Sequence, residues 1–188
     1  MGRGTVLITG ASKRIGRAIS LMLASEGYSI AIHYNNSHQA ALELSNKINC
    51  EGGNSEIFHA DLSNSDSASN LINDVESSLG RISGLVNNAS MFIYDDISNL
   101  TSNLWDSHMN INAKAPALLI KELSKATQND KRASVVNILD QKIANPSADH
   151  ISYTASRYAL LGLTDALARG LAPNIRINAV APGHTMPS

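Results

Sequence analysis

The sequence predicts an α/β protein built on a doubly wound parallel sheet. Six short runs rich in apolar and β-branched residues alternate with stretches whose apolar residues recur at helical spacing. This alternation favours parallel strands joined by right-handed crossovers, with helices on both faces of the sheet. Two such halves give the strand order 3-2-1-4-5-6, with ligand bound where the order reverses. We expect residues 1–188 to form one domain.

The first predicted strand, Thr5–Thr9, leads through a turn that contains Gly10 and Gly16 into a helix. Gly10 permits a sharp turn, and Gly16 allows close packing of helix, strand and ligand. The backbone N–H groups at such a helix start can bind a phosphate, although an ordinary strand-to-helix connection has the same pattern. The helix would bury one face, formed by Ile15, Ala18, Ile19, Met22 and Leu23.

The later elements follow the same alternation. Five further strands are predicted, at Ser29–Tyr34, Ser55–Ala60, Gly84–Asn88, Ser134–Leu139 and Arg176–Ala181. One further helix is predicted to begin near Ser37, and another carries apolar residues from Ala68 to Leu79. Two more are predicted over Asn103–Lys125 and Ser152–Leu171. Pro116 should kink the long helix over Asn103–Lys125.

Composition excludes several classes of function. A net charge of −1 and a pI near 6.6 give no support for a nucleic-acid or anionic-membrane partner. Cys50 is the only cysteine, so an internal disulfide is impossible and a reducing cytoplasm fits. The first apolar run is too short for a signal peptide, and no segment has the length of a membrane span. The six histidines are scattered, so we expect no metal site.

The order of residues 9–16, T-G-A-S-K-R-I-G, resembles the T-G-x-x-x-G-x-G turn of the short-chain dehydrogenase/reductase family. Arg14 replaces one family glycine, as in members that prefer NADPH, and the K-R pair is similar to that of the pteridine reductases. The resemblance implies that coenzyme is bound by Gly10, Ser12, Lys13, Arg14, Ile15 and Gly16.

The loop after the second predicted strand, Ser29–Tyr34, also indicates NADPH rather than NADH as the coenzyme. Residues 30–41 contain no Asp or Glu, whereas an NAD site would place an acid there for the ribose hydroxyls. Tyr34, Asn36 and Ser37, close to Lys13 and Arg14, would suit a 2′-phosphate. A solvated loop would explain the polar residues but not the missing acid, and H-Y-x-x-S again resembles the pteridine reductases.

Three further motifs resemble coenzyme contacts of the family. Asp61 and Leu62 would lie beside the adenine, although Asp61 could equally cap the next helix. The remaining implied contacts are Asn88 and Ala89, in N-N-A-S, and Pro182 and Gly183, with Thr185 reaching the carboxamide.

Tyr153 and Arg157 stand in the place of the family's Y-x-x-x-K, and a spacing of four puts them on one helix face. A tyrosine with an ordinary pKa near ~10 needs an adjacent cation to favour its phenolate. By resemblance, Arg157 also holds the nicotinamide ribose. Asp140 replaces the usual family serine, as in pteridine reductases, and could relay a proton or cap the loop after it. Asn112, chosen over Asn110, corresponds to the family asparagine that holds a relay water, or is a polar residue at a helix kink.

Ser90 and Phe92, in N-N-A-S-x-F, resemble the residues that hold the pterin ring in pteridine reductases. The resemblance implies an NADPH-dependent reductase of a dihydropterin or related pteridine, assembled as a homotetramer or homodimer. Two alternatives stay open: a general ketone or 3-oxoacyl reductase, and a dinucleotide-binding protein that has lost catalysis because Arg157 replaces lysine. We also expect that this chain lacks the family's C-terminal segment and seventh strand.

Overall fold

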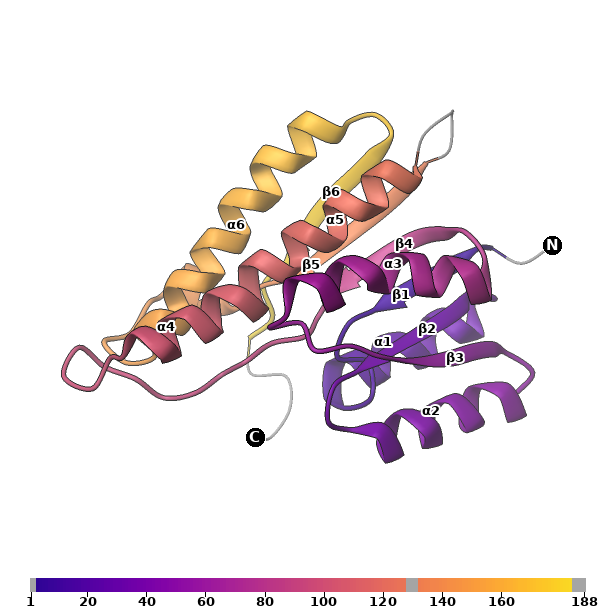
Figure 1. Ribbon diagram of the computed structural model, residues 1–188, viewed down its shortest axis with the longest axis horizontal. Helices are drawn as coiled ribbons and strands as arrows, with labels where there is room; N and C mark the ends of the chain where they lie inside the picture. Colours follow the sequence, from indigo (N-terminus) through magenta and orange to yellow (C-terminus); the bar gives the residue numbers. More distant parts are fainter. Residues whose placement is uncertain (1–2, 128–131, 184–188) are drawn as a thin grey trace.

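The computed structural model describes residues 3–127 and 132–183, which form a six-stranded parallel sheet in the order β3-β2-β1-β4-β5-β6 (Figure 1). Its strands are β1 Thr5–Ile8, β2 Ser29–Tyr34, β3 Asn54–His59, β4 Ile82–Asn87, β5 Ala133–Ile138 and β6 Ile175–Val180. The predicted fold class and strand order are confirmed, and each strand lies within two residues of its predicted bounds.

Helices lie on both faces of the sheet. They are α1 Arg14–Ser25, α2 His38–Cys50, α3 Ser65–Leu79, α4 Ser102–Met109, α5 Ala115–Ala126 and α6 Ile151–Leu171, with the short π-helix η1 Asn110–Lys114 and the 3₁₀ turn η2 Gln141–Ile143. Apolar residues of α3, α5 and α6 pack together against one face, and those of α1 and α2 against the other. In Figure 1, α4, α5 and α6 lie beside β5 and β6, away from α2. No helix within the described ranges is long and apolar enough to span a membrane.

The central strand β1 sends alternate side chains into two hydrophobic cores. Leu7 is fully buried in a cluster with Leu71 and Leu119, whereas Ile8 is fully buried in a second cluster with Leu44. A strand covered on both faces needs an uninterrupted apolar run. The run Val6–Ile8 meets that need.

The prediction for the buried face of α1 is partly wrong. Ala18 is exposed and Met22 is 59% exposed, whereas Gly16 and Ser20 are buried. A Cβ added to Gly16 would lie 2.4 Å from the carbonyl oxygen of Gly10, so this helix face approaches the turn too closely for larger side chains. The close approach sets the rotation of the helix and turns Met22 outward.

The long helix predicted over Asn103–Lys125 is interrupted before Pro116 rather than at it. Residues Asn110–Lys114 form a π-helical turn in which the Ala115 N–H donates to the Asn110 carbonyl, and Pro116 lies in the first turn of α5. Proline has no N–H to donate to the helical ladder. The π-turn places the resulting irregularity at the buried Asn112.

A buried polar chain links β4, β5 and α6. The Asn87 amide donates to Asn137 Oδ1 at 2.8 Å, and the Asn137 amide donates to Thr164 Oγ1 at 2.8 Å. Thr164 in turn donates to the Leu160 carbonyl within α6. Because buried polar groups need partners, this series of hydrogen bonds fixes the position of α6 relative to β4 and β5.

Candidate active site

The glycine turn after β1 is held by a buried histidine. Gly10, with φ of +60°, donates its N–H to His33 Nδ1 at 3.0 Å, and the Ala11 N–H donates to the His33 carbonyl. His33 Nε2, which carries the proton because Nδ1 accepts, lies 3.0 Å from the Ala60 carbonyl oxygen. Burial lowers the pKa of His33 to about 4 and keeps the ring neutral. The turn is thereby fastened to the ends of β2 and β3.

The start of α1 fits an anionic ligand. Lys13, at the N-cap, forms no side-chain cap, and the first turn contains no acidic residue, so the helix presents N–H groups to an external anion. Lys13 and Arg14 are exposed, and Arg14 has the left-handed φ of 49°. The Asn88 amide donates to the carbonyls of Thr9 and Gly10 and fixes the turn from the other side. This cradle has the shape and charge for a diphosphate.

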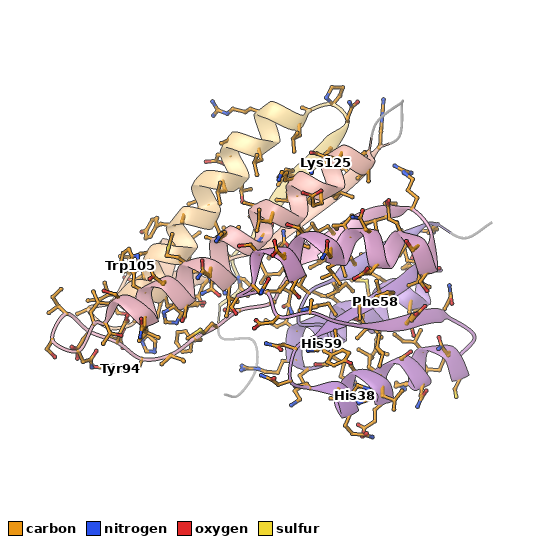
Figure 2. The ribbon with its side chains drawn as sticks, in the orientation of Figure 1. His38, Phe58, His59, Tyr94, Trp105 and Lys125 are labelled. Carbon is orange, nitrogen blue, oxygen red and sulfur yellow. The ribbon has the colours of Figure 1, made fainter. Side chains whose placement is uncertain are left out.

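The remaining residues predicted at the turn differ in exposure: Ser12 is buried, Ile15 is half-buried, and Ala89 is half-buried beside Gly10. Tyr34 ends β2, and its ring lies 5.3 Å from His38 and 5.5 Å from His59 between ring centroids. Figure 2 shows these two histidines on the side of the molecule opposite Tyr94. Asn36 is exposed, and Ser37 precedes α2, whose first turn has no acidic residue.

Asp61 and Leu62 lie just beyond the end of β3, one residue after it, where the sequence predicts adenine contacts. Leu62 is buried, and Asp61 accepts the Ser63 N–H at 2.9 Å and the Ser63 hydroxyl at 2.8 Å, which lower its pKa. The alternative role of Asp61 as a helix cap is wrong. Asn64 caps α3 by accepting the N–H groups of residues 66 and 67.

Tyr153 and Asp140 meet directly. Tyr153, in the first turn of α6, is 4% exposed and donates its hydroxyl to Asp140 Oδ2 at 2.8 Å. Asp140 follows β5, and its other oxygen accepts the Lys142 N–H at 2.8 Å. Asp140 therefore caps the η2 turn, one of the two roles predicted for it, and it also contacts the tyrosine; its role in relaying a proton stays a prediction.

Arg157 is buried beside Tyr153. Its guanidinium carbon lies 4.9 Å from the centre of the tyrosine ring, Nη1 donates to the Ile138 carbonyl at 3.1 Å, and Nη2 donates to Ser90 Oγ. Arg157 belongs to none of the ion pairs found in residues 3–127 and 132–183. Its positive charge and the Asp140 carboxylate therefore both act on the Tyr153 phenol, in opposite directions.

The balance of these contacts raises the pKa of Tyr153. Burial is the largest cause, Arg157 acts in the opposite direction, and the hydrogen bond to Asp140 adds to the increase. Arg157 lowers the pKa of Tyr153, as expected of an adjacent cation, but desolvation of the phenolate exceeds this attraction and the net direction is upward. Tyr153 is therefore protonated at neutral pH, as a tyrosine of ordinary pKa would also be.

Phe92 lies against this pair. Its ring is 56% exposed, stacks on His150 with centroids 4.2 Å apart, and meets the Tyr153 ring edge-on at 4.6 Å. Ser90 is exposed and accepts from Arg157. An exposed aromatic ring next to the Tyr153 phenol offers a surface for a flat heteroaromatic molecule.

Asn112 braces the Phe92 segment from behind. The fully buried amide accepts the Met91 N–H at 2.8 Å and donates to the Met91 carbonyl and to Ser156 Oγ, both at 3.0 Å. These bonds give the side chain a structural role; its role in holding a relay water stays a prediction.

Pro182 and Gly183 follow β6 and lie beside the loop that begins at Asp140. The Gln141 N–H donates to the Pro182 carbonyl at 3.1 Å. Gly183 is exposed, and Thr185 lies outside the described residues. In the described part of the chain, no group of three or more His, Cys, Asp or Glu could hold a metal ion.

Sequence reasoning missed a buried group next to Tyr153. Asp95 and His108 are fully buried, and both contact Ser152, the residue before the tyrosine. His108 lies one helical turn before Asn112, which was a usable signal for a buried histidine. Asp95 lies in a segment without hydrophobic periodicity, so the sequence offers no signal that this residue is buried.

Comparison with protein families matches residues 4–187 to the short chain dehydrogenase model. Among curated proteins, the chain is similar to the 3-oxoacyl-[acyl-carrier-protein] reductase FabG of Staphylococcus epidermidis, with 31% identity over 95% of this chain and 74% of the relative.

Two solved structures are similar over most of their length. FolM alternative dihydrofolate reductase 1 from Brucella canis, complexed with NADP, shares 41% identity at a TM-score of 0.94, covering 98% of this chain and 75% of that one. The Brucella suis protein of the same name, also with NADP, shares 41% identity at a TM-score of 0.95, covering 100% and 78%.

Proposed function

The chain belongs to the short chain dehydrogenase family, and on this premise we propose that it is an NADPH-dependent reductase of a dihydropterin or related pteridine. One contact carries the proposal: the Tyr153 hydroxyl donates to the Asp140 carboxylate at 2.8 Å, beside the exposed Phe92 ring. The likeness to two dihydrofolate reductases named FolM supports the same substrate class.

The coenzyme is NADP(H), held at its diphosphate by the Gly10–Gly16 turn and the start of α1. The exposed Lys13 and Arg14 would pair with a 2′-phosphate, and the absence of an acid from residues 30–41 removes the charge that would repel it. When bound, the reduced nicotinamide supplies a hydride to a carbon of the substrate.

Tyr153 supplies the proton. The hydroxyl is protonated at neutral pH, and in the free site its proton points to the Asp140 carboxylate; it would turn to the substrate ring nitrogen when the substrate binds. As the proton leaves for the substrate ring nitrogen, the unpaired charge of Arg157 stabilises the phenolate that remains. Phe92 would cover the flat ring of the substrate.

The test is NADPH oxidation with dihydrobiopterin, dihydromonapterin and dihydrofolate, compared with a 3-oxoacyl thioester. We expect turnover with at least one pteridine and its loss in Asp140→Ser, whereas Asp165→Ser, an exposed aspartate later on α6, should match the wild type. Turnover of the thioester alone would refute the pteridine assignment.

Two other functions have specific support. The 31% identity to FabG favours reduction of a 3-oxoacyl group or another ketone. Arg157 in place of lysine favours a protein that binds the dinucleotide without turning over substrate, which would show as NADPH binding with every substrate inert. We also propose a homotetramer or homodimer, to be measured by light scattering after size-exclusion chromatography.

A further inference from the structure

Asp95 is a buried carboxylate in a segment, residues 88–101, whose other residues are exposed or half-buried. The segment joins β4 to α4, and Asp95 is fully buried while its neighbours are strongly exposed: Phe92 56%, Ile93 49%, Tyr94 55% and Ile97 80%. A buried carboxylate is costly unless hydrogen-bond donors compensate it. Its partners therefore indicate what the segment is fastened to.

Those partners belong to the start of α6. Asp95 Oδ2 accepts the N–H of Ser152 at 3.1 Å and the Ser152 hydroxyl, and the Asp95 carbonyl accepts the His150 N–H at 2.6 Å. His150, at the N-cap of α6, has the left-handed φ of 55° and forms no side-chain cap. Asp95 thus caps the helix from 57 residues away, and its negative charge suits the positive end of the helix dipole.

His108 closes the connection from the other side. His108 Nε2 accepts the Ile93 N–H at 3.2 Å, so its proton is on Nδ1, which donates to Ser152 Oγ at 2.6 Å. Burial is the main cause that lowers the pKa of His108 and keeps this tautomer neutral. The hydrogen bonds run in one direction, from Ile93 through His108 and Ser152 to Asp95.

The two ends of this chain flank the site. Ile93 directly follows Phe92, and Ser152 directly precedes Tyr153. The ring centroids of Phe92 and Tyr153 are 4.6 Å apart. We propose that Asp95 is a positioning residue that sets the spacing of the Phe92 surface and the Tyr153 proton donor. The inference rests on the proposed reductase function, but not on which substrate is reduced.

The test compares Asp95→Ala and Asp95→Asn with Asp96→Ala. Asp96 is the matched control, because it is adjacent in the same segment and its side-chain bonds go to residues 94, 98 and 99 rather than to α6. We expect Asp95→Ala to lower kcat by about 10- to 100-fold, the cost of a misplaced reacting group. The Kd of NADPH should change less than twofold, since Asp95 bonds to residues 150 and 152 and not to the Gly10–Gly16 turn that would hold the coenzyme diphosphate.

Asp95→Asn keeps an oxygen for both Ser152 donors and should retain most of kcat. Hydrogen exchange of residues 151–154, followed by mass spectrometry, should accelerate in Asp95→Ala but not in Asp96→Ala. Wild-type kcat in folded Asp95→Ala, an equal loss in Asp96→Ala, or a parallel loss of NADPH binding would overturn the proposal.

The result is separable from the substrate assignment. If the wild type reduces a ketone and no pteridine, the proposed substrate is wrong and the variants are compared on that ketone. If it reduces neither, the exchange measurement decides: unchanged exchange at the start of α6 in Asp95→Ala overturns the role, and faster exchange supports it.

Discussion

Substitution of Gly16 by alanine tests the coenzyme cradle directly. A Cβ at Gly16 would lie 2.4 Å from the Gly10 carbonyl oxygen, 2.7 Å from Asn88 Nδ2 and 2.9 Å from Ala11 Cα. Two of these atoms belong to the backbone and cannot rotate away. Overpacking of this kind costs about 1–3 kcal/mol, against a gain of roughly 0.5–1 kcal/mol from alanine in a helix. We expect a net loss of about 1–2 kcal/mol.

A loss of that size lowers Tm by roughly 2–8 °C for a chain of this length. Because Gly10 and Asn88 must move to admit the methyl group, the Kd of NADPH should rise by about tenfold or more, equivalent to ~1.4 kcal/mol. The assays are thermal unfolding and titration of NADPH fluorescence.

Gly162→Ala is the matched control, because it lies in α6 and a Cβ there meets nothing within 4 Å. It should stabilise the protein by about 0.5–1 kcal/mol and leave the Kd of NADPH unchanged. The reasoning fails if Gly16→Ala binds NADPH as tightly as the wild type, or if the two glycine variants behave alike.

Three further predictions concern single side chains. Tyr153→Phe should lower kcat by about 100-fold or more while NADPH still binds, measured by NADPH oxidation and fluorescence titration; unchanged turnover would exclude the phenol as proton donor. Arg157→Lys should lower Tm, since lysine cannot reach both the Ile138 carbonyl and Ser90; activity appearing only in the variant would identify the natural protein as a coenzyme binder. Because the folded pKa of His33 is about 4 against 6.5 unfolded, the stability it contributes is present above pH 6.5 and is lost between pH 6.5 and 4, by about 3 kcal/mol. Urea unfolding at pH 7 and pH 4.5 measures this, and His33→Phe should show a shallower decline.

The sequence predicted the sheet well because its signals are local. Each strand is an apolar run bounded by turn residues, and Leu7 and Ile8 are buried on opposite faces as a parallel strand requires. The rotation of α1 was not predictable from periodicity, because Gly16 is buried by its lack of a side chain. Periodicity counts hydrophobic residues and ignores contacts that depend on small ones.

The site was predicted in part for a similar reason. Tyr153 and Arg157 are four residues apart, so a helix brings them together by itself. The contact of Tyr153 with Asp140 depends on where β5 ends relative to α6. Asp95 acts across 57 residues from an irregular segment, and only the folded arrangement reveals it.

The buried chain from Asn87 through Asn137 to Thr164 has a consequence for how such an enzyme could diversify. It anchors the helix that carries Tyr153 to the interior of the sheet, remote from solvent. Segments that face the substrate can then accept substitutions during evolution while the Tyr153 phenol keeps its position relative to the carboxyl ends of the strands. The position of the reacting group thus depends on the buried hydrogen bonds of α6, whereas substrate selectivity depends on the segments that face the substrate.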